Sequence, residues 1–170
     1  MDKTNIVLIG MPSSGKSTIG RRLSEELEMG FIDTDSVIRQ AENRELKEIV
    51  NTDGLQKFLD IQESAVLGIK ATNHVIATGG GVVYGTASMQ HLKSGGIIIY
   101  LENGFEEIEN RIAEGRRFAR QQGQSLRDIY NERVPLYEKY ADIITDCTGK
   151  SVDAICQTIK SSIAEWKQKG

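Results

Sequence analysis

The chain lacks the features that mark disulfide-rich proteins, proteins with cysteine metal sites, membrane-spanning proteins and nucleic-acid-binding proteins. Its 170 residues include only two cysteines and two prolines. Cys147 and Cys156 lack the spacing of a metal-ligand set, so we expect them to be reduced, structural thiols. No apolar run approaches the roughly 18 residues that a membrane span needs. The formal net charge of −3 disfavours a nucleic-acid partner, because nucleic acids favour basic domains.

The rest of the composition is ordinary for a globular protein. Hydrophobic residues make up 39% of the chain and charged residues 26%, which is enough for one hydrophobic core. We therefore expect a single domain over residues 1–170. Residues 1–5 lead directly into the first apolar run and leave no room for a signal peptide, so we expect a cytoplasmic protein. The modest apolar surface that we infer favours a monomer.

Residues 10–17 spell G-x-x-x-x-G-K-S, the pattern of a phosphate-binding loop. The loop follows an apolar run at residues 6–9 and precedes Ile19, Leu23 and Leu27, whose spacing predicts a helix. Strand, glycine loop and helix are the context that this motif requires. The pattern therefore predicts a site for a nucleoside triphosphate.

Each part of the loop has a physical task. Glycines let successive N–H groups point into one concavity, and the helix start adds the positive end of its dipole. Lys16, expected to be exposed, can reach the terminal phosphates, and the Ser17 hydroxyl can bind Mg²⁺. The residues expected to contact the nucleotide are Gly10, Ser13, Ser14, Gly15, Lys16, Ser17 and Thr18.

Apolar strand candidates alternate with helical patterns along the chain, which predicts an α/β fold with parallel strands. The five predicted strands cover residues 6–9, 30–32, 75–77, 97–101 and 143–144. In open sheets of this kind, ligands bind beyond the carboxyl ends of the strands. The functional residues are therefore expected where these strands end.

Two aspartates follow the second predicted strand. Asp33 is expected to bind Mg²⁺ together with Ser17, because Mg²⁺ takes one or two carboxylates and keeps several waters. Asp35 is expected to orient an acceptor hydroxyl and to take its proton. The alternative for Asp35 is a helix N-cap.

Gly79, Gly80 and Gly81 follow the third predicted strand. Three missing side chains let the backbone approach a ligand, so these glycines are expected to form the floor of an acceptor pocket; the alternative is a flexible turn. Arg133 precedes Pro135, where we expect the helix to be interrupted. It can hold an anionic substrate group by a two-point contact, or it is a surface arginine.

Residues 114–125 form a polar stretch that contains Arg116, Arg117 and Arg120. One interpretation is a lid that closes over the nucleotide, excludes water and brings arginine to the phosphates. The other is a solvated loop.

Taken together, these pieces resemble the shikimate kinase family. The matching motifs are the phosphate loop, F-I-D-T-D at residues 31–35, Asp53-Gly54 with Phe58, T-G-G-G at 78–81, the arginine-bearing lid and R-x-P-L-Y at 133–137. The resemblance implies a three-layer α/β/α P-loop kinase fold of the nucleoside-monophosphate-kinase type, with a five-stranded parallel sheet in the order 2-3-1-4-5 and a lid segment.

The resemblance also implies roles for individual residues, with ATP and Mg²⁺ as cofactors. Lys16 would contact the phosphates, and Ser17 and Asp33 would bind Mg²⁺. The acceptor site would be lined by Asp35, Gly79, Gly80, Gly81 and Arg133. Arg111 would lie over ATP with Arg116 or Arg117 from the lid, Arg117 being the expected catalytic arginine.

Two positions depart from the family pattern. The family carries an arginine directly after the phenylalanine that Phe58 matches, and this arginine grips the carboxylate of the acceptor. Here that position is Leu59, and Gln62 stands where the family has a glutamate. Both members of the ion pair are therefore neutral.

The sequence as a whole predicts an ATP-dependent kinase that acts on a small-molecule hydroxyl. Shikimate, an intermediate of aromatic amino-acid (chorismate) biosynthesis, is the expected acceptor at its 3-hydroxyl. One alternative is a kinase of the same fold that acts on another small hydroxy metabolite, such as a sugar acid or a hydroxy amino acid; Leu59 and Gln62 favour it. A nucleotide-binding regulatory protein without transfer activity is the other alternative.

Overall fold

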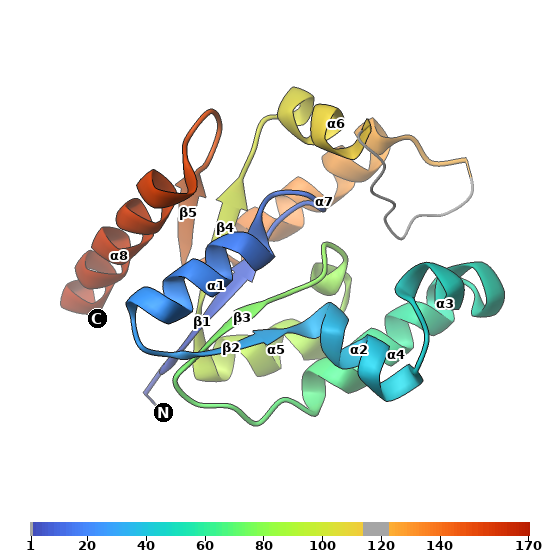
Figure 1. Cartoon of the computed structure of the whole chain (residues 1–170), viewed down its shortest axis with the longest axis horizontal. Helices are drawn as coiled ribbons and strands as arrows, with labels where there is room; N and C mark the ends of the chain where they lie inside the picture. The colour runs from blue at the N-terminus through green and yellow to red at the C-terminus, as the bar shows by residue number, and fades with distance from the viewer. Residues whose placement is uncertain (1, 114–122) are drawn as a thin grey trace.

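The computed structural model describes residues 2–113 and 123–170, and its centre is a five-stranded parallel sheet (Figure 1). The strands are β1 (Asn5–Ile9), β2 (Gly30–Asp33), β3 (His74–Ala77), β4 (Gly96–Glu102) and β5 (Ile143–Asp146). They pair in the order β2-β3-β1-β4-β5, with every neighbouring pair parallel. The α/β class and the predicted order 2-3-1-4-5 are confirmed.

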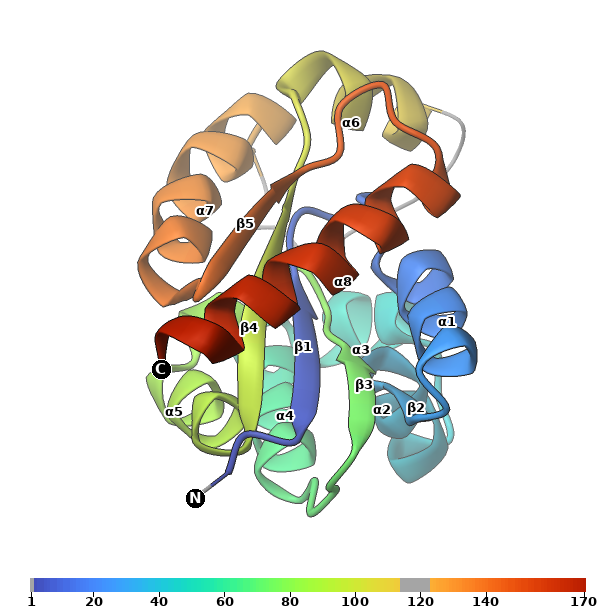
Figure 2. The same cartoon turned by 90° about the vertical axis from the view of Figure 1, so that its left-hand side faces the viewer.

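Helices cover both faces of the sheet because the central strands are apolar on both sides. Successive side chains of a strand point to opposite faces, so Ile6 and Leu8 join one core cluster while Val7 and Ile9 join the other. Figure 2 shows the helices of the first face, which are α1 (Lys16–Glu26) and α8 (Val152–Lys169). The second face packs against α4 (Leu55–Leu67), α5 (Thr86–Gly95) and α7 (Leu126–Tyr140).

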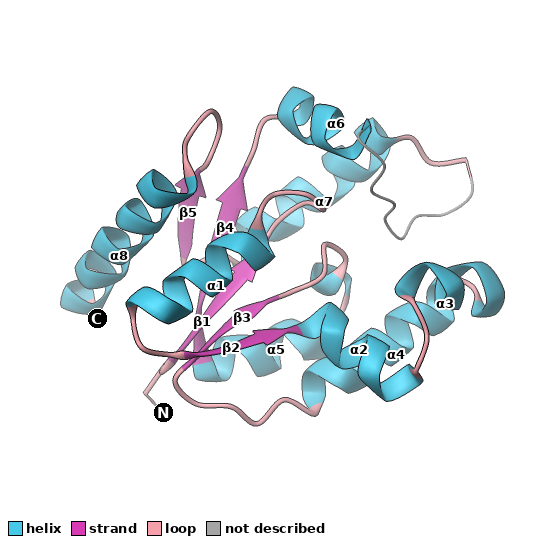
Figure 3. Cartoon of the chain, in the orientation of Figure 1, coloured by secondary structure: helices cyan, strands magenta, loops and turns pink. Residues whose placement is uncertain are grey.

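A smaller group of helices lies beside the carboxyl end of β2, as Figure 3 shows. It consists of α2 (Thr34–Glu42) and α3 (Leu46–Asp53), which pack on α4 through Ile38, Ile49 and Phe58. The remaining elements are α6 (Phe105–Ala113) and the 3-10 turn η1 (Val82–Tyr84). This small cluster fixes one side of α4 beside the site described below.

The expected interruption at Pro135 is wrong, because α7 continues through the proline to Tyr140. Ile129, Arg133 and Tyr137 are buried at intervals of four residues along one side of this helix. Packing of that face on both sides of the proline outweighs the local cost of a missing N–H group.

Two further expectations concern the cysteines and membrane-spanning helices. Cys147 and Cys156 are buried free thiols. Within the described ranges, no helix has both the length and the apolar character needed to cross a bilayer.

Candidate phosphoryl-transfer site

The phosphate loop connects β1 to α1, and its backbone requires glycine at two positions. Gly10 has a φ of 154°, and a Cβ placed there would lie 2.9 Å from the Leu101 carbonyl oxygen. Gly15 has a left-handed φ of 92° and is the N-cap of α1, so the helix starts at Lys16 with its N–H groups directed toward the loop. A loop of this shape, leading into a helix N-terminus, can direct backbone N–H groups at phosphate oxygens.

Lys16 is buried, with only 8% of its surface exposed, so the expected exposure is wrong. Its Nζ donates hydrogen bonds to the carbonyl oxygens of Gly10 (2.7 Å) and Met11 (2.8 Å). The ammonium is thereby folded back along the loop, within reach of the concavity. Without these carbonyl partners, the burial of this charge would be costly.

Ser17 and Asp33 lie side by side at the carboxyl edge of the sheet. The Ser17 hydroxyl donates a 2.8 Å hydrogen bond to Oδ2 of Asp33. The other carboxylate oxygen accepts from the N–H groups of Asp35 (2.9 Å) and Ser36 (3.4 Å). Asp33, and not Asp35, is therefore the N-cap of α2. A hydroxyl and a carboxylate are hard oxygen ligands, so this pair fits Mg²⁺.

Asp35 begins the first turn of α2 and points toward the same edge. Burial raises the pKa of its carboxyl group, and the neighbouring charge of Asp33 raises it further, while Lys16 and Arg39 act in the opposite direction. A carboxylate with a raised pKa is a better proton acceptor near neutral pH. The alternative that Asp35 caps the helix is wrong, because Asp33 is the cap, and the Asp35 side chain is left available for other contacts.

The three glycines after β3 provide space. A Cβ on Gly79 would lie 2.8 Å from Oδ1 of Asp35 and 2.9 Å from Oε1 of Gln62. A Cβ on Gly80 would lie 2.8 Å from the ring of Pro12 in the phosphate loop. Gly81 has a φ of −94°, which any residue can adopt. Close approach of neighbouring groups, rather than turn flexibility, explains this motif.

Hydroxyl groups hold the glycine segment in place. The N–H group of Gly79 donates to the Thr34 hydroxyl at 3.1 Å, and the Tyr137 hydroxyl donates to the Gly80 carbonyl at 2.5 Å. The segment is thus tied to α2 on one side and to α7 on the other. Thr34 and Tyr137 both belong to motifs noted in the sequence, but neither motif predicted these contacts.

Arg133 is 3% exposed, so the alternative of a surface arginine is wrong. Its Nε donates to the Tyr84 hydroxyl at 3.2 Å. Its Nη1 lies 3.0 Å from the position of a Cβ on Gly80 and its Nη2 lies 3.6 Å from that on Gly81. The guanidinium therefore faces the glycine segment. Sequence reasoning missed Tyr84, because a tyrosine near the end of a glycine turn has no characteristic pattern.

A cavity of about 320 Å³ lies between α4, η1 and α7. Leu59, Gln62 and Glu63 line it from α4, and Tyr84 and Arg133 line it from the opposite side. The two residues that depart from the family pattern thus border the same space as Arg133. The glycine segment lies next to this lining, because a Cβ on Gly79 would meet Gln62 as well as Asp35, and a Cβ on Gly80 would meet Arg133.

Arg111, in α6, contacts the phosphate loop from the other side. It donates to the Ser13 carbonyl at 2.8 Å and forms a 2.6 Å ion pair with Glu107. Ser14 is buried within the loop, whereas Thr18 is exposed on α1. The lid arginines Arg116, Arg117 and Arg120 lie outside the described residues, and so does most of the predicted lid.

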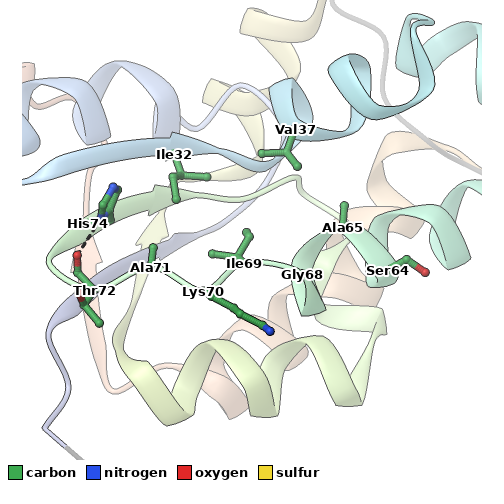
Figure 4. A pocket seen from close by; sticks show the side chains of 10 residues that line it. All are labelled: Ile32, Val37, Ser64, Ala65, Gly68, Ile69, Lys70, Ala71, Thr72 and His74. Atoms are coloured by element: carbon green, nitrogen blue, oxygen red, sulfur yellow. Dashed lines mark hydrogen bonds between the residues drawn. The ribbon is translucent and has the colours of Figure 1, made fainter.

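A larger hollow of about 700 Å³ lies under β2 and the start of β3 (Figure 4). Apolar side chains such as Ile32, Val37 and Ile69 form much of its lining, and the His74 ring is engaged by the Thr72 carbonyl at 2.8 Å. None of the described residues that line it carries a carboxylate. It therefore lacks the groups for phosphoryl transfer that the carboxyl edge of the sheet provides.

Comparisons with known proteins agree with this geometry. A sequence profile for shikimate kinase matches residues 12–164. The chain is 34% identical to a shikimate kinase of Clostridium botulinum (strain Loch Maree / Type A3), over 96% of this chain and 98% of that protein. It is 37% identical to a shikimate kinase of Paracidovorax citrulli, over 91% and 89%.

A solved structure shows the same fold. The shikimate kinase of Acinetobacter baumannii in complex with shikimate superposes with a TM-score of 0.88 at 28% identity, covering 95% of this chain and 93% of that one. The profile match, the two relatives and the shared strand order are mutually consistent. The chain belongs to the shikimate kinase family.

Proposed function

We propose that this chain transfers the γ-phosphoryl group of ATP to the 3-hydroxyl of shikimate. The observation that carries the proposal is the convergence at one sheet edge of Lys16, the Ser17–Asp33 pair and Asp35. The names of the relatives favour shikimate over another small hydroxy metabolite. Catalytic carboxylates beside the phosphate loop argue against a protein that only binds nucleotide.

The geometry supports a task for each group. The loop amides, with Gly10, Ser13, Ser14, Gly15 and Thr18 in or next to the loop, would hold the phosphates, and Lys16 would neutralise their charge. Mg²⁺ bound by Ser17 and Asp33 would supply further positive charge at the phosphate oxygens. Arg111 would lie beside the nucleotide, together with Arg116 or Arg117 from the lid.

The acceptor would lie between the glycine segment and α4. Asp35 would orient the 3-hydroxyl and take its proton as the new P–O bond forms, while the bond to ADP breaks. Arg133 would bind the carboxylate of shikimate with its Nη atoms. Gly79, Gly80 and Gly81 would let the ring approach the backbone closely.

Activity with shikimate tests the proposal directly. ADP release in a coupled assay should depend on shikimate, ATP and Mg²⁺, and phosphorus NMR should show a phosphate ester at the 3-position. Asp35→Asn should reduce kcat by about 10²- to 10⁴-fold, the range for loss of a general base. Turnover that responds to another hydroxy compound but not to shikimate would refute the acceptor assignment.

The proposal also covers the oligomeric state and the cellular location of the protein. We propose that the 18.8 kDa chain acts as a monomer in the cytoplasm. Light scattering during gel filtration measures the mass in solution, and a value of twice this mass would overturn the monomer.

A further inference from the structure

Gln62 occupies a core position on α4. The buried residues of this helix are Phe58, Gln62 and Val66, which are spaced by four and therefore share one face. Phe58 and Val66 are apolar members of core clusters. Gln62 lies between them with only 4% of its surface exposed. A carboxamide therefore stands where the pattern of the helix requires an apolar side chain.

The carboxamide of Gln62 has no partner within the protein as described. Neither its oxygen nor its nitrogen forms a hydrogen bond to any residue in ranges 2–113 and 123–170. A glutamine amide offers two donors and an acceptor, and the amide atoms of Gln62 are not among the fully buried, unpartnered side-chain atoms of the described residues, so they are open to the cavity that Gln62 lines. A ligand that supplies the missing partner is a direct explanation for this position.

The side chain is directed at the acceptor site. Oε1 of Gln62 and Oδ1 of Asp35 lie 2.9 Å and 2.8 Å from the same point, the position that a Cβ on Gly79 would occupy. Gln62 also lines the 320 Å³ cavity together with Leu59 and Arg133. An amide and a carboxylate thus meet over one glycine, where no side chain separates them from a ligand.

We propose that Gln62 recognises the phosphoryl-accepting hydroxyl of the substrate, by a hydrogen bond made over Gly79 beside Asp35. The hydroxyl donates its proton to the Asp35 carboxylate and accepts from the amide N–H of Gln62, which a half-turn of the carboxamide brings into position. Gln62 is then a specificity residue that selects for a hydroxyl at this point. This inference rests on the proposed function, because it names a further contact in the same acceptor site.

The rival explanation is a structural one, in which Gln62 only fills space in the helix interface. The two explanations differ in what an apolar variant of the same shape does. If Gln62 binds the acceptor, Gln62→Met removes an amide that pairs with no described residue, so the melting temperature stays about the same while acceptor recognition is lost. If Gln62 supports the fold, the variant melts at a lower temperature and its acceptor KM is unchanged.

The test compares steady-state kinetics and thermal unfolding of the wild type and Gln62→Met. We expect the KM for shikimate to rise by about tenfold or more, with the KM for ATP and the melting temperature maintained. Gln157→Met, a matched change at an exposed position of α8, should leave all of these values unchanged. An unchanged KM for shikimate in a folded Gln62→Met variant would overturn the inference.

A second measurement tests the proposed contact of Gln62 by binding, independently of phosphoryl transfer. Calorimetry compares the binding of shikimate and of 3-deoxyshikimate, which lacks the accepting hydroxyl, to the ADP complex. The wild type should bind 3-deoxyshikimate about tenfold more weakly, and this ratio should shrink in Gln62→Met; an equal ratio in both proteins refutes the contact. If the wild type binds and phosphorylates shikimate but the affinity ratio is the same in Gln62→Met, the inference alone is contradicted. If the wild type neither binds nor phosphorylates shikimate, the proposed function is contradicted and the inference with it.

Discussion

Replacing Leu59 with arginine should strengthen shikimate binding. A Cβ on Gly81 would lie 3.8 Å from Cδ2 of Leu59 and 3.6 Å from Nη2 of Arg133. The two side chains therefore border the same point, and both line the 320 Å³ cavity. An arginine at position 59 is long enough to share with Arg133 a carboxylate bound at this point.

The expected gain follows from one added charge-assisted contact. A hydrogen bond to a charged group contributes about 1.5–3 kcal/mol. Part of this is offset, because the introduced guanidinium lies near Arg133 and because Glu63, four residues further along α4 and on the same cavity, competes for it. We therefore expect a net gain of about 1–2 kcal/mol, which corresponds to a decrease of about 5- to 30-fold in the KM for shikimate.

The assay varies shikimate at saturating ATP and Mg²⁺ for the wild type, Leu59→Arg and the volume-conserving control Leu59→Met. The methyl ester of shikimate, which lacks the negative charge, should show no gain in Leu59→Arg. The double variant Leu59→Arg/Gln62→Glu restores an ion pair in α4 and should position the guanidinium better than the single variant. An unchanged KM in folded Leu59→Arg, or an equal gain for the ester, would show that the carboxylate lies elsewhere.

The structure supports three further predictions. Gly79→Ala should lower kcat/KM for shikimate at least tenfold with a small change in melting temperature. The Asp35 and Gln62 oxygens that face the new methyl group can move away from it, but they then leave the positions proposed for acceptor binding; equal activity would contradict this. Ser17→Ala should raise the Mg²⁺ concentration needed for half-maximal activity, and Asp33→Ala should do the same and also lower stability by about 1 kcal/mol through loss of a helix cap, as Mg²⁺ titrations and urea unfolding can measure. Burial raises the pKa of the Cys147 thiol to about 12. The contribution of the neutral thiol to the free energy of unfolding is therefore complete below pH 9 and is lost as the pH rises toward 12. Urea unfolding should show that the free energy of unfolding falls more steeply over this range in the wild type than in Cys147→Ala.

Much of the fold was predictable because its signals are local. Apolar runs separated by helical periodicity indicate parallel strands, and each predicted strand is present. The order of the strands came from the resemblance, since periodicity alone does not say which strands are neighbours. Pro135 misled the prediction, because a local signal of helix interruption was outweighed by packing at Ile129, Arg133 and Tyr137. That the whole chain acts as one kinase domain stays a prediction.

The candidate site, like the fold, has parts that the sequence predicted and parts that it did not. The loop at residues 10–17 and Asp33 were predictable, because one motif and the end of one strand place them at the same sheet edge. The contact between Tyr84 and Arg133 joins groups far apart in the chain, which no local pattern reports. The burial of Lys16 was missed although its carbonyl partners lie in the same loop. A helix cap was considered only for Asp35, as the alternative to its role at the acceptor, whereas the backbone geometry makes Asp33 the cap.

The paired replacement at Leu59 and Gln62 has a simple energetic logic. A buried ion pair adds little net stability, because desolvation of the two charges offsets their attraction, but removal of one partner alone leaves a buried charge unpaired. Loss of both charges therefore preserves the α4 interface where loss of either one would not. The consequence for binding differs, because in the proposed complex the carboxylate of the acceptor would then depend on Arg133. The neutral amide of Gln62 is left facing Gly79 beside Asp35, so in the proposed complex recognition on this side of the cavity would shift from a charge to a hydroxyl.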